Sequence, residues 1–433
     1  MTPMSQPLTS PPPLSAFRLM SPGEMDRTDR IVQAAAEQIA ERGAAASARS
    51  IAAAAGAAPS AINYNFGSIE RLFSAAFAHG VRLTADWLEA RGPEILALPK
   101  SPEGAVQALE HLVAAWTRDA RPLALLYQEC LGATAGLAPE ARELNAEGPG
   151  GDWIRLWRDH WLRTATAFGL GEAEGRLLHL LFQSEALFHL SAWSPALEGA
   201  ALREMCDHFG ATWLGGARRS GGEALILAER TAGARSHGSL APSALRIADG
   251  AAEVVEARGL GGLTHRAVAA RAGVTTGAVT HHFRTVEDLV AGAIRGQVAA
   301  MTREPIGPDG ATQAIEDILT ADQMFEAMEL RILADRPLSV VLRRRSLFLA
   351  TVRRADLAGA GAVIRFSFGG TARDAMGRIY QLPADTLVLH ASLLSRLLAT
   401  IWIACAGDAF PQASREAATG EILGRLRRRL EAG

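Results

Sequence analysis

Hydrophobic residues recur at the spacing of an α-helix along most of the chain. Ile31, Ala35 and Ile39 fall on one face of a helix that the sequence predicts to end at Gly43, because glycine readily takes the backbone conformation that ends helices. The sequence has no runs of alternating β-branched residues bounded by glycine or proline, whereas alanine, leucine, arginine and glutamate are abundant. The pattern therefore predicts an all-α fold.

Two shorter helices are predicted next. Ser47 is suited to cap the first of them, and this helix directs Ile51 inward. It stops at Gly56, where a tight turn needs a residue that tolerates positive φ. Ser60 lies at the start of the following helix. Short helices joined by a tight turn are typical of a helix-turn-helix motif.

The chain repeats this pattern at half its length. Residues 30–73 read RIVQAAAEQIAERGAAASARSIAAAAGAAPSAINYNFGSIERLF, and residues 246–290 read RIADGAAEVVEARGLGGLTHRAVAARAGVTTGAVTHHFRTVEDLV. A second match lies deeper, between ARPLALL at 120–126 and DRPLSVV at 335–341. Repetition at a fixed period indicates duplicated structural units. The sequence therefore predicts two full-length copies in tandem.

The domain boundaries follow from the repeat and from composition. A stretch between the copies is rich in glycine, serine and alanine, as linkers are. The predicted segments are a Pro/Ser-rich disordered arm at 1–25, helix-turn-helix domains at 26–74 and 243–291, helical bodies at 75–215 and 292–433, and a linker at 216–242. Within the linker, the ALILAE segment could form a docked helical turn.

Both motifs resemble the DNA-binding fingerprint of the TetR family, named for the tetracycline repressor. The matching stretches read SARSIAAAAGAAPSAINYNFGSIE and LTHRAVAARAGVTTGAVTHHFRTVE. The resemblance implies that the third helix of each motif enters the major groove, that each body forms a ligand pocket, and that the last two helices of each body pair into a four-helix interface. These helices would be 171–191 and 196–214, and 384–405 and 414–431. We expect an intrachain pseudo-dimer, and a homodimer of such chains stays open.

Residues for contact with DNA are assigned by their positions in the two motifs. The groove-facing candidates are Ser60, Ala61, Asn63, Tyr64 and Asn65 in the first copy, and Thr275, Thr276, Gly277, Thr280, His281 and His282 in the second. The phosphate candidates are Ser47, Arg49, Thr264, His265, Arg266 and Arg284. Two alternatives stay open: Tyr64 could brace its helix against the core, and the histidine pair could be a solvated helix end.

The motifs depart from the family pattern in ways that concern DNA binding. The usual aromatic residue is Asn63 in one copy and Thr280 in the other, and the usual lysine before the glutamate is Ile69 or Val286. The only charge between Ser47 and Phe66 is Arg49, whereas the second motif carries Arg266, Arg271 and Arg284 without acids. The second motif is therefore the better electrostatic match to DNA, and the first could be weak or degenerate.

Seven of the eight tryptophans lie in the first half, which suggests an apolar effector pocket there. Ordinary core aromatics are the alternative. The candidate lining residues are Trp116, Tyr127, Gln128, Trp157, His160, Trp161 and Gln183.

Composition narrows the function classes. The chain has 44 basic and 46 acidic residues, so its overall charge is no signature of nucleic-acid binding. Its three scattered cysteines and lack of a signal peptide favour a cytoplasmic protein, and no metal-ligand spacing, membrane span or cofactor motif is seen. The sequence has no Gly-rich phosphate loop, paired carboxylates or nucleophile elbow, so an enzyme is not expected.

The sequence thus predicts a ligand-responsive DNA-binding regulator, a repressor that a small apolar or amphipathic molecule releases. Because the two motifs differ, the operator should be asymmetric. The alternative is a sensor or interaction protein with one or both motifs degenerate, which would not bind DNA directly.

Overall fold

The structure is a computed structural model. It describes residues 26–135, 148–217, 221–236, 241–258, 262–301, 320–333, 345, 348–354, 357–406, 408 and 411–432. All regular elements in these residues are helices, which confirms the all-α prediction. The arm predicted for residues 1–25 lies outside the described residues.

The first half begins with a three-helix head and continues into a helical body. Its elements are α1 (Arg27–Arg42), the 3-10 turn η2 (Gly43–Ala45), α2 (Ala48–Ala54), α3 (Ser60–Phe66), α4 (Ile69–Leu96), α5 (Pro102–Arg118), α6 (Arg121–Ala135), α8 (Pro149–Ala167), α9 (Glu172–Phe188) and α10 (Pro195–Trp213). Gly43 ends α1 at a φ of 56°, and Ser47 caps α2, both as the sequence predicts.

The second half repeats this order in its head. The elements are α12 (Pro242–Arg258), α13 (His265–Ala272), α14 (Thr276–His282), α15 (Val286–Met301), α16 (Ala321–Leu333), α18 (Ala358–Ser367), α19 (Gly370–Ile379), α20 (Ala384–Ala404) and α21 (Pro411–Glu431). Thr264 caps α13, and Gly273 ends it in the left-handed conformation, at a φ of 65°. Both heads therefore contain a hydroxyl N-cap on the second helix and a glycine that ends a helix.

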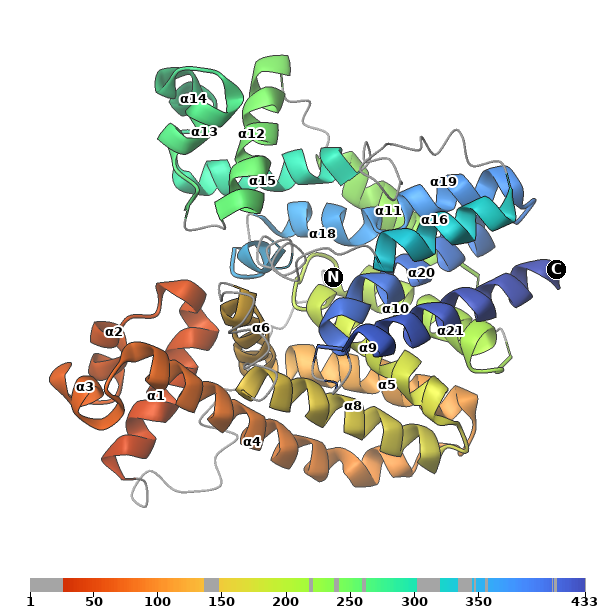
Figure 1. Cartoon of the computed structure of the whole chain (residues 1–433), viewed down its shortest axis with the longest axis horizontal. Coiled ribbons are helices and arrows are strands. Elements are labelled where there is room, and N and C mark those ends of the chain that lie inside the picture. The colour runs from red at the N-terminus through yellow and green to blue at the C-terminus, as the bar shows by residue number, and fades with distance from the viewer. Residues whose placement is uncertain are drawn as a thin grey trace, which may run out of the picture.

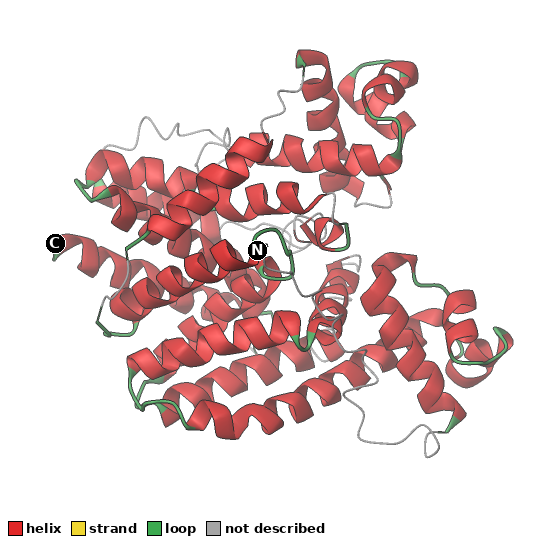
Figure 2. Ribbon diagram, turned by 180° about the vertical axis from the view of Figure 1, so that it is seen from behind, coloured by secondary structure: helices red, strands yellow, loops and turns green. Residues whose placement is uncertain are grey.

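Both heads lie at the same end of the longest axis, away from the end of α21 (Figures 1 and 2). In the first head α1 packs on α4, and in the second α12 packs on α15. Each of these long helices runs from a head into the body, so each head is carried by one continuous helix.

The predicted linker contains a folded helix, α11 (Glu223–Ser236), which packs on α10 of the first half and on α18 of the second. Both carboxylate oxygens of Glu204 accept backbone N–H groups at its start, from Ala224 and Leu225, at 2.9 Å each. Glu229 pairs with Arg373 at 2.6 Å. This part of the connection is therefore a docked element and not an extended chain.

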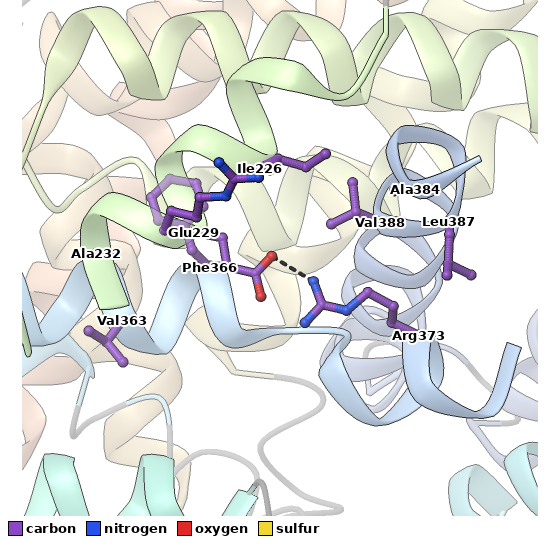
Figure 3. A pocket seen from close by; sticks show the side chains of 10 residues that line it. Ile226, Glu229, Ala232, Val363, Phe366, Arg373, Ala384, Leu387 and Val388 are labelled. Atoms are coloured by element: carbon purple, nitrogen blue, oxygen red, sulfur yellow. Dashed lines mark hydrogen bonds and ion pairs between the residues drawn. The ribbon is translucent and has the colours of Figure 1, made fainter. Parts of the chain in front are cut away.

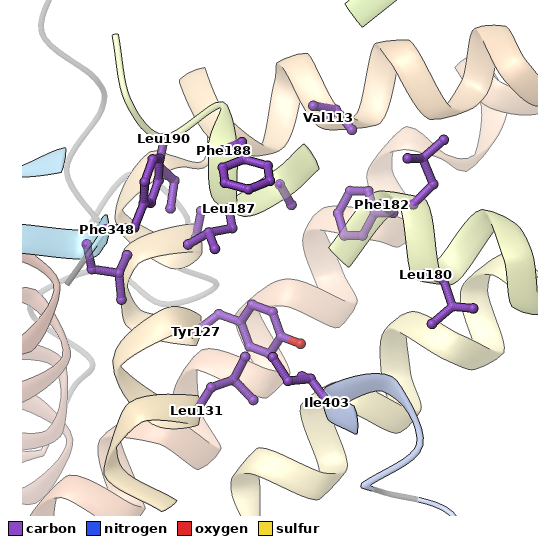
Figure 4. Close-up of a cluster of buried hydrophobic side chains, with 14 of the residues drawn as sticks. Val113, Tyr127, Leu131, Leu180, Phe182, Leu187, Phe188, Leu190, Phe348 and Ile403 are labelled. Carbon is purple, nitrogen blue, oxygen red and sulfur yellow. The ribbon is translucent and has the colours of Figure 1, made fainter. Parts of the chain in front are cut away.

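The two halves pack through the four helices that the sequence predicts for a pairing interface. Helix α9 lies against α20 and α21, and α10 also contacts both α20 and α21. Figure 4 shows buried side chains from both halves meeting, with the Phe188 and Phe348 rings 5.3 Å apart and Ile403 close to the first body. The two halves of the chain therefore pair with each other through these helices.

Helix α20 is long and apolar enough to cross a membrane, judged by length and composition. However, 78% of its most apolar stretch is buried inside the protein. Its apolar character is explained by its central place among α9, α10 and α21.

The second half also contacts the first head. The Nη1 atom of Arg353 lies 2.7 Å from a carboxylate oxygen of Glu129 on α6. The Nη2 atom of Arg353 donates to the backbone carbonyl of Ala40 on α1 at 3.2 Å. The end of the first head is thus held by both halves of the chain.

Acid should destabilise the fold. Burial lowers the pKa of His160 and His189 to about 4 and that of His179 to about 3. As the pH is lowered below 6.5, these three rings bind protons in the unfolded chain but not yet in the folded chain. The free energy of unfolding therefore decreases as the pH is lowered, by up to about 4 kcal/mol per pH unit for three rings. Urea unfolding at pH 7, 6 and 5 measures this slope. The variant His179→Gln should lose about a third of it, and equal stability at pH 7 and 5 would contradict the prediction.

Candidate nucleic-acid interface

The third helix of the first head exposes a polar face. Ile62 is 1% exposed and anchors α3 in the core of the head, whereas Ser60, Asn63, Tyr64 and Asn65 are exposed. Tyr64 is 89% exposed, so the alternative that it braces the helix against the core is wrong. A short helix with a buried apolar side and an exposed polar side is suited to lie in a groove of DNA.

Ala61 does not belong to this exposed face. It is 6% exposed because the period of the helix turns it toward the core beside Ile62. We therefore correct its assignment as a groove-facing residue. The amide of Asn65 donates to the carbonyl of Ala61 at 2.7 Å, which holds that side chain on the helix.

In the second head, hydroxyl groups cap both short helices. The Thr264 hydroxyl accepts the backbone N–H of Ala267 at 3.1 Å, and the Thr275 hydroxyl accepts that of Ala278 at 3.2 Å. The exposed residues on and beside α14 are Thr275, Thr276, Gly277, Thr280, His281 and His282, and all of them are sequence-predicted candidates.

Several of these candidates also make contacts inside the head. The ring of His265 is partly buried and lies 2.8 Å from the carbonyl oxygen of Phe283, to which its Nε2 can donate. The hydroxyl of Thr280 donates to the Thr276 carbonyl at 3.0 Å, and His282 lies 3.1 Å from the Ser243 hydroxyl on α12. His265 thus has a structural role in joining α13 to the end of α14.

The exposed positive charges differ between the heads. The first motif presents Arg49, and the second presents Arg266 and Arg284. Arg271 is less available than the sequence suggests, because it pairs with Glu253 on α12. Val286, at the position of the family's usual lysine, is 46% exposed.

Comparison with known families decides what these two heads are. Residues 31–76 and 247–293 each match the family model described as bacterial regulatory proteins, tetR family. Both heads are therefore helix-turn-helix domains of the TetR family, present twice in one chain. Regulators of this family are not enzymes, and their N-terminal domains bind DNA. No curated protein matches the regulator.

The aromatic residues predicted to line an effector pocket do come together in the first body. Trp116 on α5 lies 5.0 Å from Trp157 on α8, and Trp157 lies 4.1 Å from Phe182 on α9, measured between ring centroids. Trp87 on α4 joins them, 5.3 Å from Trp116. We call Trp87, Trp116, Trp157, His160, Trp161 and Phe182 the tryptophan cluster.

Polar groups of this cluster lack partners. The indole N–H groups of Trp87, Trp116, Trp157 and Trp161 and the Nε2 atom of His160 are buried and have no hydrogen-bond partner among the described residues. The other three candidates have partners: Tyr127 donates to Gln183 at 2.8 Å, and Gln128 accepts from Arg345 at 2.5 Å. Buried donors without acceptors are uncommon and call for an explanation.

A cavity of about 530 Å³ lies in the second body, and Figure 3 shows its walls. It is mostly apolar, with the Glu229–Arg373 ion pair on one side. The lining residues are Ile226, Glu229, Arg230, Ala232, Val363, Phe366, Arg373, Ala384, Leu387 and Val388. Sequence reasoning missed this cavity because α11, taken as part of a linker, forms one of its walls.

The part of the chain that the structure describes has no cluster of His, Cys, Asp or Glu that could hold a metal ion. Cys130, Cys206 and Cys405 are buried and unpaired, and burial raises the pKa of all three thiols.

The variant Tyr64→Ala tests the first head. Because the ring is 89% exposed, its removal should leave the melting temperature unchanged within about 2 °C, while DNA affinity falls about tenfold, the usual cost of one base-reading contact. Fluorescence anisotropy on the operator at fixed salt measures the affinity. An unchanged affinity would show that the first head contributes nothing through this residue.

Proposed function

We propose that this regulator represses transcription in the cytoplasm by binding an asymmetric operator with both heads at once, and that a small apolar or amphipathic effector releases it. The observation that supports asymmetry most is the contrast between the exposed faces of α3 and α14. One presents Asn63 and Tyr64, and the other presents Thr280 and two histidines. Different side chains prefer different base edges in the major groove, so the two half-sites should differ.

Both heads are anchored to one body, which supports simultaneous binding. The pairing of α9 with α20 joins the halves, and the heads project at the same end of the molecule (Figure 1). We propose the domain division that the sequence predicts, with DNA-binding heads at 26–74 and 243–291. Two heads of fixed spacing would recognise half-sites at a fixed spacing.

Operators of defined symmetry test this proposal. A duplex selected from a random pool should contain two unlike half-sites. The chain should bind it at least tenfold more tightly than a palindrome of either half-site at the same salt concentration, because each palindrome mismatches one head. Equal binding to one of the palindromes would contradict asymmetric recognition. Binding to a single half-site alone would indicate that the other head is degenerate.

For the effector we propose the tryptophan cluster of the first body. Its aromatic faces suit an apolar planar molecule, and its unpartnered indole N–H groups suit a carbonyl or ether oxygen on that molecule. The side chains are closely packed, so the cluster must open to admit a ligand.

The cluster is mechanically linked to the first head. Trp87 lies on α4, which begins beside α3 in the head and continues to Leu96 in the body. Because α4 also packs on α8, a molecule inserted between Trp87 and Trp157 would push these helices apart. Movement of α4 would displace α3 from the position it needs for its half-site.

A matched pair of probes tests this site. Fluorenone and fluorene have the same planar ring system, but only fluorenone has a carbonyl acceptor. Fluorenone should bind about tenfold more tightly in equilibrium dialysis and should lower operator affinity, because its oxygen accepts a buried N–H. The variant Trp157→Phe, which removes one such donor but keeps an aromatic ring, should weaken fluorenone binding.

The cavity of the second body provides the control. Leu387→Trp fills that cavity, and Leu227→Trp makes the same change at a position that is 54% exposed and outside its lining. Neither should alter fluorenone binding. If Leu387→Trp abolishes binding while Trp157→Phe does not, the effector site lies in the second body and the tryptophan cluster is ordinary core.

A further inference from the structure

Four charged side chains meet at the centre of the contact between the halves. Glu185 on α9 pairs with Arg396 on α20 at 2.8 Å, and Glu198 on α10 pairs with Arg365 on α18 at 3.2 Å. Arg365 also lies 3.8 Å from Glu185. Both acids belong to the first half and both arginines to the second. We call these four residues the buried charge cluster.

The cluster is closed to solvent. The side chains of Glu185, Arg365 and Arg396 are 0% exposed, and that of Glu198 is 6% exposed. Further hydrogen bonds hold the arginines, including one from Arg396 to the backbone carbonyl of Arg365 at 3.1 Å and one to that of Ser392 at 3.3 Å. Two negative and two positive charges therefore compensate each other out of contact with bulk solvent.

Glu185 and Arg396 occupy equivalent positions of the two halves. The sequence of α9 reads LHLLFQSE from Leu178, and that of α20 reads LHASLLSR from Leu389, so both leucine–histidine pairs and both serines align. In a symmetric pairing of two such helices, equivalent residues near the axis face each other. The chain places opposite charges at this shared position.

Pairing of like halves would bring like charges together. Two first halves would bury Glu185 against a second Glu185, and two second halves would bury Arg396 and Arg365 against the same residues of another chain. A buried charge that lacks its counter-charge is strongly destabilising, more so than any contact at an exposed edge. Only the pairing of a first half with a second half places each of the four charges beside an opposite charge.

We propose that the buried charge cluster is a pairing code that makes each half fit only the unlike half. It thereby excludes the homodimers that two similar bodies would otherwise form between chains. Helix α11, which packs on α10 and α18 of the same chain, keeps the unlike halves together within one polypeptide. The result is one chain that always presents one head of each kind. This inference concerns assembly and does not depend on whether either head binds DNA.

Charge reversal in the full-length chain tests the code. Glu185→Arg leaves arginines at both equivalent positions, and Arg396→Glu leaves glutamates at both. Each single variant should melt at least about 10 °C below the parent chain, or fail to give soluble protein. Asp408→Arg serves as the control, because its ion pair with Arg158 also joins the halves at 2.6 Å but is partly exposed, with side chains 16% and 25% accessible. Its melting temperature should fall by about 3 °C or less.

Two recovery experiments separate a pairing code from simple intolerance of these sites. The double variant Glu185→Arg/Arg396→Glu restores opposite charges within one chain and should regain more than half of the lost melting temperature. Co-expression of the two single variants should yield a 1:1 complex of twice the 45.8 kDa chain mass, because the first half of each then matches the second half of the other. Light scattering coupled to size exclusion measures this mass.

The outcomes are distinct. Single variants as stable as Asp408→Arg would overturn the proposal, because the cluster would then contribute no selectivity. Failure of both the double variant and the co-expressed pair to recover would also overturn it, because the positions would then require their native residues whatever the charge of the partner.

Discussion

The packing of α9 against α20 is the contact on which the rest of the structure depends. It joins the two halves through apolar side chains and, at its centre, through Glu185 and Arg396, which are both inaccessible to water. The long helices α4 and α15 start in the heads and run into this joined body. The relative position of the heads is therefore set by a contact far from either of them.

Duplication within one chain frees each half to change independently. In a homodimer, any substitution appears on both sides of the axis, so a glutamate facing the axis would meet its own copy. Here the first half supplies the acids and the second half the arginines. The same freedom is visible in the heads, where Tyr64 and His281 belong to the corresponding third helices, α3 and α14. It is also visible in the bodies, where one contains the tryptophan cluster and the other an open cavity.

The two halves also share the support of a head. Arg353 from the second half contacts Glu129 and the end of α1 in the first. A rearrangement of either body can therefore reach the first head, through α4 from its own side and through Arg353 from the other. The proposed effector would therefore not need to change both halves equally.

The heads could be predicted closely from sequence, because their determinants are local. A glycine that ends α1, the hydroxyl groups that cap α2 and α13, and the alternation of buried and exposed positions on α3 all act within a few residues of chain. The burial of Ala61, the internal contacts of His265, Thr280 and His282, and the ion pair of Arg271 with Glu253 were missed there. The four helices that join the halves were also located, because the resemblance to the TetR family implies that the last two helices of each body pair.

The sequence alone could not predict the features that depend on contacts between distant segments. The docking of α11, the cavity that it helps to form, and the partners of Arg353 depend on residues that the fold brings together across the chain. The charges of Glu185 and Arg396 are plain in the sequence, but only the packing of α9 on α20 removes both from water and makes their opposite signs matter.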